Sequence, residues 1–276
     1  MNAVNVAPVA DTGLAKRRQR RFKVPLGWLW GVAGFALLII CWQLLVSLAA
    51  VQETALPRPL SVVEALSEHR AVLWEHSQIT LIEILLGFVL SAVSGFLIAL
   101  LIDSSRILYR LLYPLMIVAQ AVPKLALVPV ILIWFGFGRT SNAVIALLIS
   151  VFPVIVNTLH GFQSVDRRYV ELGRVMAGSH FMRFRKIRLP AAMPSIFTGL
   201  KLGMSFATVG AVAGEIFAGS EGLGYVVSSA AGALDTPLAY AAIVVISALG
   251  LILYYLMLWL EKRLLPWASG DLVTGM

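Results

Sequence analysis

The residues Gln78–Ile102 read QITLIEILLGFVLSAVSGFLIALLI and are the clearest guide to the architecture of this chain. Glu83 is the only charged residue in this run of apolar and small side chains. About 20 apolar residues in a helix cross the hydrocarbon core of a bilayer, so the run is long enough to span a membrane. Its apolar residues do not alternate with polar ones, as they would in a strand of a membrane barrel. The run therefore predicts a transmembrane helix.

Five further runs of the same kind are Leu26–Val51, Leu111–Gly138, Ser141–Phe162, Ala191–Ala218 and Pro237–Leu260. Of the 276 residues, 59% are hydrophobic and 13% are charged, and the mean hydropathy is +0.88. Soluble domains carry roughly 25% charged residues because their surface must be wetted, so soluble enzymes and disordered proteins are excluded. The expected fold class is an all-α polytopic membrane protein with six transmembrane helices. The third run is expected to be broken by Pro114, Pro123 and Pro129.

Lysine and arginine are divided unevenly between the predicted loops. One side carries 17, six of them within 16–23 and seven within 167–188, whereas the other side carries three, and Lys124 and Lys201 lie within spans. Basic loops stay in the cytoplasm, so both termini are expected there. The resulting order is a cytoplasmic tail (1–25), a first span (26–51), a periplasmic loop (52–77), a core transmembrane domain (78–265) and a second cytoplasmic tail (266–276). The first run is too long for the core of a signal peptide and is expected to stay as an anchor.

The cytoplasmic loop 166–190 has the pattern of two short amphipathic helices. Gly178 fits the end of the first helix, and Ser179 fits the start of the second. Phe181, Phe184 and Ile187 then recur every three residues, and Pro190 is expected to begin the next span, with the residue before it outside the helix. A basic turn lying on anionic lipid has this character, and so does a docking element for a cytoplasmic protein. Two aromatic side chains and an ordered break favour the docking element.

The same loop resembles the EAA loop of ATP-binding-cassette importer permeases, through Glu171-Leu172-Gly173, Ala177-Gly178 and Ile187-Arg188-Leu189-Pro190. Leu172 and Gly173 stand where the pattern has alanines, and its glycine falls on Ala177, one residue before Gly178. Outside the loop, five segments resemble permeases of the nitrate/sulfonate/taurine group: Leu56–Pro59, Val122–Pro129, Trp134–Gly138, Gly214-Glu215-Ile216 and Gly222–Tyr225. Pro123–Ala126 and Leu234–Pro237 look closest to a branch linked to thiamine-precursor or small aromatic substrates.

The resemblance implies a type I importer permease fold in the bacterial cytoplasmic (inner) membrane. Its implied partners are two ATPase subunits that carry ATP and Mg, a second permease chain, expected to be another copy, and a periplasmic or tethered solute-binding protein. It also implies that the loop is a coupling helix seated on the ATPase, with the residues Glu171, Leu172, Gly173, Ala177, Gly178, Phe181, Phe184 and Pro190. The chain itself is expected to bind no cofactor, metal or nucleic acid and to be no enzyme.

Charges inside the membrane are costly, which makes each one a functional candidate. Lys124 and Glu215 are the candidates for the translocation pathway, and Lys124 is expected either to pair with Glu215 or to face an anionic substrate. A buried hydrogen-bonded carboxylate is the structural alternative for Glu215. Glu83 is expected at the rim of the membrane, and Lys201 is expected to have a structural role.

Two other classes of protein stay open from the residues alone. A secondary transporter or channel would work without an ATPase and is expected to carry inverted repeats, none of which is found in the sequence. A structural membrane anchor does not explain the broken span and the buried charges. No phosphate-binding loop is present, so ATP hydrolysis is expected on another subunit. The expected solute is small and anionic or aromatic, of the sulfonate, taurine or nitrate type, with a pyrimidine thiamine precursor as the alternative.

Overall fold

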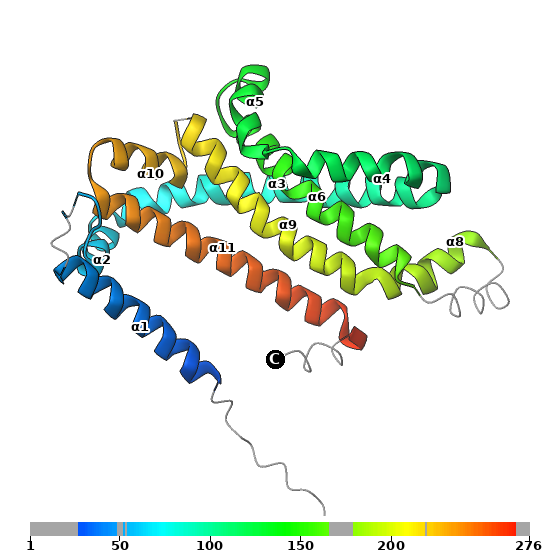
Figure 1. The fold of residues 1–276 in the computed structure, drawn as a ribbon, viewed down its shortest axis with the longest axis horizontal. Helices are drawn as coiled ribbons and strands as arrows, with labels where there is room; N and C mark the ends of the chain where they lie inside the picture. The colour runs from blue at the N-terminus through cyan, green and yellow to red at the C-terminus, as the bar shows by residue number, and fades with distance from the viewer. Residues whose placement is uncertain (1–26, 49–51, 53, 166–178, 219, 269–276) are drawn as a thin grey trace, which may run out of the picture.

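A computed structural model of the chain describes residues 27–48, 52, 54–165, 179–218 and 220–268 (Figure 1). The part of the chain that it describes forms helices and connecting turns, without a strand. The helices are α1 (Gly27–Leu48), α2 (Pro59–Glu68), α3 (Arg70–Ser104), α4 (Arg106–Ala121), η1 (Lys124–Leu127), α5 (Val128–Phe135), α6 (Arg139–Gln163), α8 (His180–Arg183), the π-helical turn η2 (Phe184–Arg188), α9 (Leu189–Ala218), α10 (Leu223–Gly232), α11 (Thr236–Leu264) and η3 (Pro266–Ala268).

Five segments are long and apolar enough to cross a membrane, namely α1, α3, α6, α11 and the stretch Phe181–Phe217, which contains α9. A sixth span exists only if α4 is joined to η1 and α5, which meet at an angle of 83°. The break falls at Pro123, because proline lacks the N–H group that would continue the helical hydrogen bonds. The predicted third span, Leu111–Gly138, is therefore present as two helices at a steep angle. The predicted breaks at Pro114 and Pro129 are wrong, because Pro114 lies inside α4 and Pro129 lies in the first turn of α5, where no N–H group is needed.

The centre of the molecule is the crossing of α3, α6 and α9 (Figure 1). Glycine and alanine at the crossing let the backbones approach closely, which favours helix packing in membranes. A methyl group added at Gly210 of α9 would lie 2.6 Å from the Cα atom of Ala146 in α6. A methyl group at Gly214 would lie 2.6 Å from the side-chain oxygen of Asn142. Small residues therefore set the distance between the two central helices.

A buried ion pair joins α9 to α11. The Nζ atom of Lys201 lies 2.7 Å from Oε2 of Glu261, and the two side chains are only 13% and 6% exposed. An ionised group in an apolar region needs a partner of opposite charge. This contact agrees with the structural role predicted for Lys201, and it identifies a buried acid in the last span that the sequence analysis did not single out.

The helix that enters the core from the loop does not begin at Pro190. Leu189 has α-helical backbone angles, with φ −64° and ψ −50°, and the preceding residues form the π-helical turn η2. The wider hydrogen bonds of a π turn insert one extra residue into a helix. The prediction that Leu189 lies outside a helix and that the span begins at Ala191 is therefore wrong. From His180 to Ala218 the chain is continuously helical.

Candidate functional site

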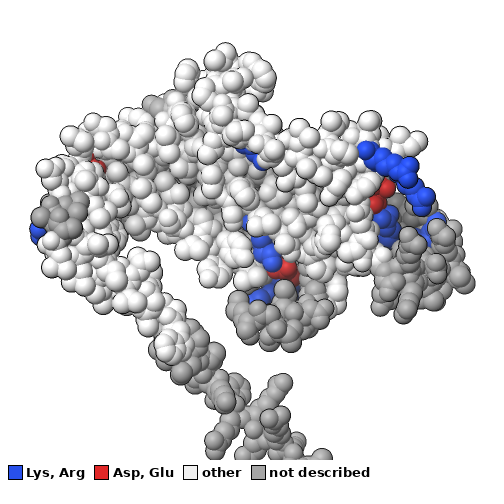
Figure 2. All heavy atoms as spheres, in the orientation of Figure 1, with Lys and Arg blue, Asp and Glu red and all other residues white. Residues whose placement is uncertain are grey.

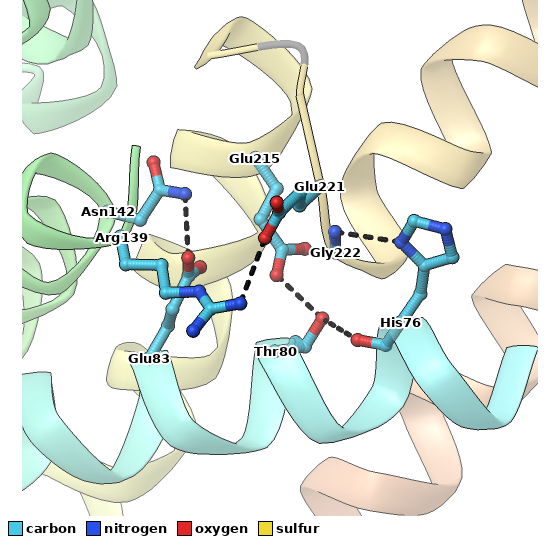
Figure 3. A network of polar contacts seen from close by, with 8 residues as sticks. All are labelled: His76, Thr80, Glu83, Arg139, Asn142, Glu215, Glu221 and Gly222. Carbon is cyan, nitrogen blue, oxygen red and sulfur yellow. Dashed lines mark hydrogen bonds and ion pairs between the residues drawn. The ribbon is translucent and has the colours of Figure 1, made fainter. Parts of the chain in front are cut away.

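A network of polar groups lies buried where α3, α6 and the turn between α9 and α10 meet (Figure 3). Glu215 of α9 is fully buried. The hydroxyl group of Thr80 donates to its Oε1 atom at 2.6 Å, and the N–H group of Gly224 donates to its Oε2 atom at 2.7 Å. Both carboxylate oxygens are thus engaged in holding the turn. This geometry favours the structural alternative for Glu215 over a role in the pathway.

The turn that Glu215 holds requires glycine at its last position, directly before α10. Gly222 has φ +94°, a conformation that side chains with a Cβ atom disfavour, and an added methyl group there would collide with the carboxylate of Glu215. The N–H group of Gly222 donates to Nδ1 of His76 at 3.0 Å, and the N–H group of Leu223 donates to Thr80 at 2.9 Å. The turn preceding α10 is therefore tied to α3 as well as to α9.

Glu83 is buried in the same region, with 1% of its surface exposed. The prediction that it lies at the rim is wrong, because α3 begins at Arg70, well before the predicted span, and carries Glu83 into the contact with α6. Its Oε1 atom accepts a hydrogen bond from the side-chain amide of Asn142 at 3.0 Å. Its Oε2 atom and the Oδ1 atom of Asn142 are buried and have no hydrogen-bond partner among the described residues.

A cavity of about 410 Å³ lies beside Glu83 and Asn142, whose two unpartnered oxygens are themselves buried. Its lining residues are Glu83, Gly138, Arg139, Asn142, Ser220 and Glu221. Arg139 and Glu221 form an ion pair of 3.0 Å, and both are about half exposed. The lining thus combines two buried polar residues, Glu83 and Asn142, with the half-exposed ion pair of Arg139 and Glu221, and Figure 3 shows how these side chains lie.

Lys124, the other predicted pathway residue, lies directly after the break between α4 and α5. It is half-buried, and its Nζ atom lies 4.9 Å from the centre of the Phe152 ring in α6. No ion pair between Lys124 and Glu215 is present among the residues that the structure describes. Its charge is stabilised by the face of an aromatic ring instead.

The predicted coupling residues Glu171, Leu172, Gly173, Ala177 and Gly178 lie outside the described residues. Of the other three, Phe181 lies in α8, Phe184 lies in η2 and Pro190 lies at the start of α9. The side chain of Phe181 is 71% exposed, whereas the ring of Phe184 packs at 5.7 Å from that of Phe162 in α6. The structure thus separates two phenylalanines that the three-residue spacing placed on one face.

Arg188, to which the sequence analysis assigned no role of its own, makes extensive contacts at this end. Its guanidinium group pairs with Asp103 at the end of α3 at 3.0 Å. It also donates to the carbonyl oxygen of Phe162 at 3.1 Å and lies 5.9 Å from the centre of that ring. In the sequence, Asp103 directly follows an apolar run and Arg188 lies in a basic loop. This combination of an acid and a basic loop could have indicated the pair.

Residues 87–266 match the model of a protein family, described as the binding-protein-dependent transport system inner membrane component. The chain belongs to this family. The matched region begins within α3 and ends after α11, so it contains Asn142, Glu215 and the end where Arg188 lies, whereas His76, Thr80 and Glu83 precede it.

Similar proteins support the assignment of the chain to this family. A probable ABC transporter permease protein of Haemophilus influenzae is 35% identical over 82% of this chain and 92% of its own length. The putative aliphatic sulfonates transport permease SsuC of Bacillus subtilis is 31% identical over 98% of this chain and 99% of its own. The formylaminopyrimidine transport permease ThiX of Halalkalibacterium halodurans is 32% identical over 84% of this chain and 93% of its own.

A solved structure, described as an amino acid ABC transporter with histidines, superposes on 73% of this chain and 96% of the other with a TM-score of 0.57. The two sequences are 19% identical, so this likeness concerns the fold alone. The expectation of a permease fold is confirmed. The protein is a multi-pass permease subunit of a type I ABC importer in the inner membrane, a family of transport subunits whose ATPase is a separate subunit. Among the described residues, no group of three or more His, Cys, Asp or Glu is placed to hold a metal ion.

Proposed function

We propose that this permease imports a small solute by alternating access, driven through the loop 166–190 by ATPase subunits that bind ATP and Mg. The observation that carries this proposal is the continuous helix from His180 to Ala218. It connects the end of the loop with the buried network at Glu215. A displacement at the loop therefore acts on the whole length of α9, because a helix transmits movement along its axis.

The exposed side chain of Phe181 supports an ATPase contact at this end. It is 71% exposed on a helix whose next aromatic residue, Phe184, is packed against the core. Figure 2 shows charged side chains gathered in two places on this face, at the end of the molecule where α8 lies and near the C-terminal end of α11. An exposed aromatic beside basic residues is typical of the centre of a protein interface. A loop that only lies on anionic lipid is the alternative.

We place two copies of this chain in the transporter, with two ATPase subunits and a periplasmic or tethered solute-binding protein. The support is the apolar surface of α5 and the turn after it. Ile133, Trp134 and Phe137 are 80%, 74% and 75% exposed. Apolar side chains of this size are covered by lipid or by a partner. A second copy on this face would cover the region next to the break at Lys124.

The topology that we propose follows from the distribution of basic residues. The tails 1–25 and 266–276 and the loop 166–190 lie in the cytoplasm, 26–51 forms the first span, 52–77 is the periplasmic loop and 78–265 forms the transmembrane core. In this orientation α8 and Arg188 face the ATPase, and the cavity at Glu83 lies toward the periplasm. Labelling of single cysteines in the two tails of intact and opened cells tests the assignment.

The solute class follows from the relatives and from Lys124. Relatives are named for aliphatic sulfonates and for formylaminopyrimidine. A half-buried lysine at the broken helix suits a sulfonate or another anion, and Phe152 beside it suits an aromatic ring. We therefore retain an anionic solute and a pyrimidine as the two candidates. Uptake of labelled members of each class into cells with and without the gene discriminates between them.

The decisive experiment on coupling replaces residues of the loop in the assembled transporter. Glu171→Ala, and Gly178→Leu separately, should leave the chain in the membrane but abolish ATP-driven uptake. Capture of an ATPase cross-linked within 166–190 is expected from the wild-type protein. Normal uptake in both variants would contradict the assignment of the loop, and uptake that persists after ATP depletion would indicate a secondary transporter.

A further inference from the structure

Another cavity lies at the end of the core where Arg188 pairs with Asp103. It measures about 220 Å³ and lies between the end of α3, the start of α4 and the end of α6. Pockets for small organic molecules measure roughly 300–1,000 Å³, so this cavity suits a compact group rather than a whole solute. Its lining residues are Asp103, Ser105, Arg106, Tyr109, Arg110 and Gln163.

The charges of this lining are unbalanced. Asp103 is its only acidic residue, and Arg188 holds both oxygens of that carboxylate, at 3.0 and 3.1 Å. Arg106 and Arg110 are exposed and form no ion pair with any residue that the structure describes. The cavity therefore carries two positive charges that the described part of the chain does not neutralise.

The lining also has hydrogen-bond donors to spare. Within the described residues, four of its side chains make no hydrogen bond, namely those of Tyr109, Gln163 and the two arginines. Each guanidinium group carries five N–H donors in a planar fork that matches the oxygens of a phosphate group. The cavity is therefore suited to a compact anion with several oxygen acceptors.

The surface of α4 beside the two arginines is apolar and uncovered. Arg106 and Arg110 lie four residues apart, on one side of the helix, and each directly precedes a residue of an apolar stripe. The residues of this stripe recur every three to four positions and are between 59% and 76% exposed: Ile107, Leu111, Leu115 and Val118. Two positive charges at the head of an apolar stripe match the head group and the acyl chains of one lipid. A soluble anion has no use for the stripe.

We propose that this cavity binds the phosphate group of an anionic phospholipid, with Arg106 and Arg110 as its ligands and the apolar stripe of α4 against the acyl chains. Tyr109 and Tyr113 stack at 4.9 Å beside it, and tyrosine is enriched at the depth of lipid head groups. The assignment to the cytoplasmic leaflet rests on the topology proposed above, whereas the chemistry of the site does not. A lipid bound here lies next to the ion pair that fixes the entry of α9.

The test uses the assembled transporter, purified in a mild detergent, and dioleoyl phosphatidylglycerol as the probe. Native mass spectrometry of a lipid titration gives the Kd of the wild type and of Arg106→Gln/Arg110→Gln. Each basic residue near an anionic lipid surface contributes about fivefold in affinity, so the double variant should bind about 30-fold more weakly. Lys262→Gln/Arg263→Gln removes two exposed basic residues at the end of α11 and is the matched control, which should keep the Kd of the wild type.

Three results would overturn the proposal. An equal loss of affinity in both double variants would show that surface charge in general attracts the lipid. Equal binding of zwitterionic dioleoyl phosphatidylcholine would show that the negative charge is not recognised. Loss of the ATPase subunits from Arg106→Gln/Arg110→Gln, with its Kd for the lipid unchanged, would identify the cavity as a protein contact.

A free anion offers the same oxygens, and the Tm of the transporter separates it from a lipid. Phosphatidylglycerol should raise the Tm of the wild type more than that of Arg106→Gln/Arg110→Gln, while inorganic phosphate and methanesulfonate should leave both unchanged. If either free anion raises the Tm of the wild type as much as the lipid does, and does not do so in the variant, the cavity is a site for a free anion. The assignment to a lipid is then wrong.

A measurement on the wild type alone covers the case in which the double variant does not accumulate. A phosphatidylglycerol analogue with a diazirine in its head group should, on irradiation, label peptides that contain Arg106, Arg110 or Gln163, and label found only elsewhere contradicts the site. ATP-driven uptake in vesicles separates this inference from the proposed function. Intact ATP-driven uptake without lipid binding at the arginines refutes the site alone, whereas uptake that needs no ATP refutes the importer mechanism and leaves the lipid site standing.

Discussion

Arg188 and Asp103 are joined by two contacts at the end of the core where the loop enters. Nη1 of Arg188 lies 3.0 Å from Oδ2 of Asp103, and Nη2 lies 3.1 Å from Oδ1. This paired geometry is the strong form of an ion pair, because both hydrogen bonds are directional. Arg188 belongs to the π turn that precedes α9, and Asp103 lies at the end of α3. The pair therefore fixes the entry of α9 against the core.

Arg188→Ala should weaken ATP-driven uptake while the protein still accumulates in the membrane. The side chains of Arg188 and Asp103 are 27% and 11% exposed, so the loss in stability is expected at about 1–3 kcal/mol. Tm and uptake are measured for Arg188→Ala, for Asp103→Ala and for the exchanged pair Arg188→Asp/Asp103→Arg. The exchanged pair should recover part of the uptake. Arg70→Ala, which removes an exposed arginine at the start of α3 and outside the loop, is the matched control and should behave as the wild type.

The two phenylalanines of the entering helix should respond differently to removal of the ring. Phe181→Ala should leave Tm unchanged and lower the ATPase stimulation and uptake, because this ring is 71% exposed. Phe184→Ala should lower stability by about 1–2 kcal/mol, since the ring is only partly buried against Phe162. Tm and ATPase activity of both variants check the expectation. Equal effects on Tm would contradict the division of roles.

Gly222→Ala should disrupt the turn that Glu215 holds. The residue has φ +94°, and the new methyl group would meet the carboxylate of Glu215, so a loss of more than about 2 kcal/mol is expected. Gly232→Ala, at the end of α10, is the matched control because nothing lies within 4 Å of the added methyl group. The Tm of each purified variant is the measurement, and an unchanged Tm for Gly222→Ala would contradict the role of the turn.

The ion pair between Lys201 and Glu261 should be costly to break from one side. Replacing one partner of a buried pair leaves an uncompensated charge and costs about 3–5 kcal/mol. Lys201→Met and Glu261→Leu are each expected to lower Tm and membrane accumulation. The double variant should be closer to the wild type, because two apolar side chains leave no charge behind. A double variant as unstable as the sum of the singles would show that the pair has no coupling.

The run Gln78–Ile102 was sufficient to predict a membrane helix, because the free energy of moving a residue into the bilayer depends on its own side chain. A break in the third run was predictable from its prolines, because each removes a backbone hydrogen bond. Which proline breaks the helix was not, since Pro114, Pro153 and Pro194 lie inside α4, α6 and α9. The EAA-like residues of the loop indicated the family before any geometry was known. These three inferences needed no knowledge of which helices touch.

The pairing of the charges could not be predicted in this way. Arg188 lies 85 positions from Asp103, and Thr80 lies 135 positions from Glu215. The partners of a buried charge depend on which helix faces meet, and the energy that selects those faces is shared among many small contacts. The burial of Glu83, the engagement of Glu215 by the turn at Gly222 and the separation of Phe181 from Phe184 therefore emerge only when α3, α6 and α9 are packed together.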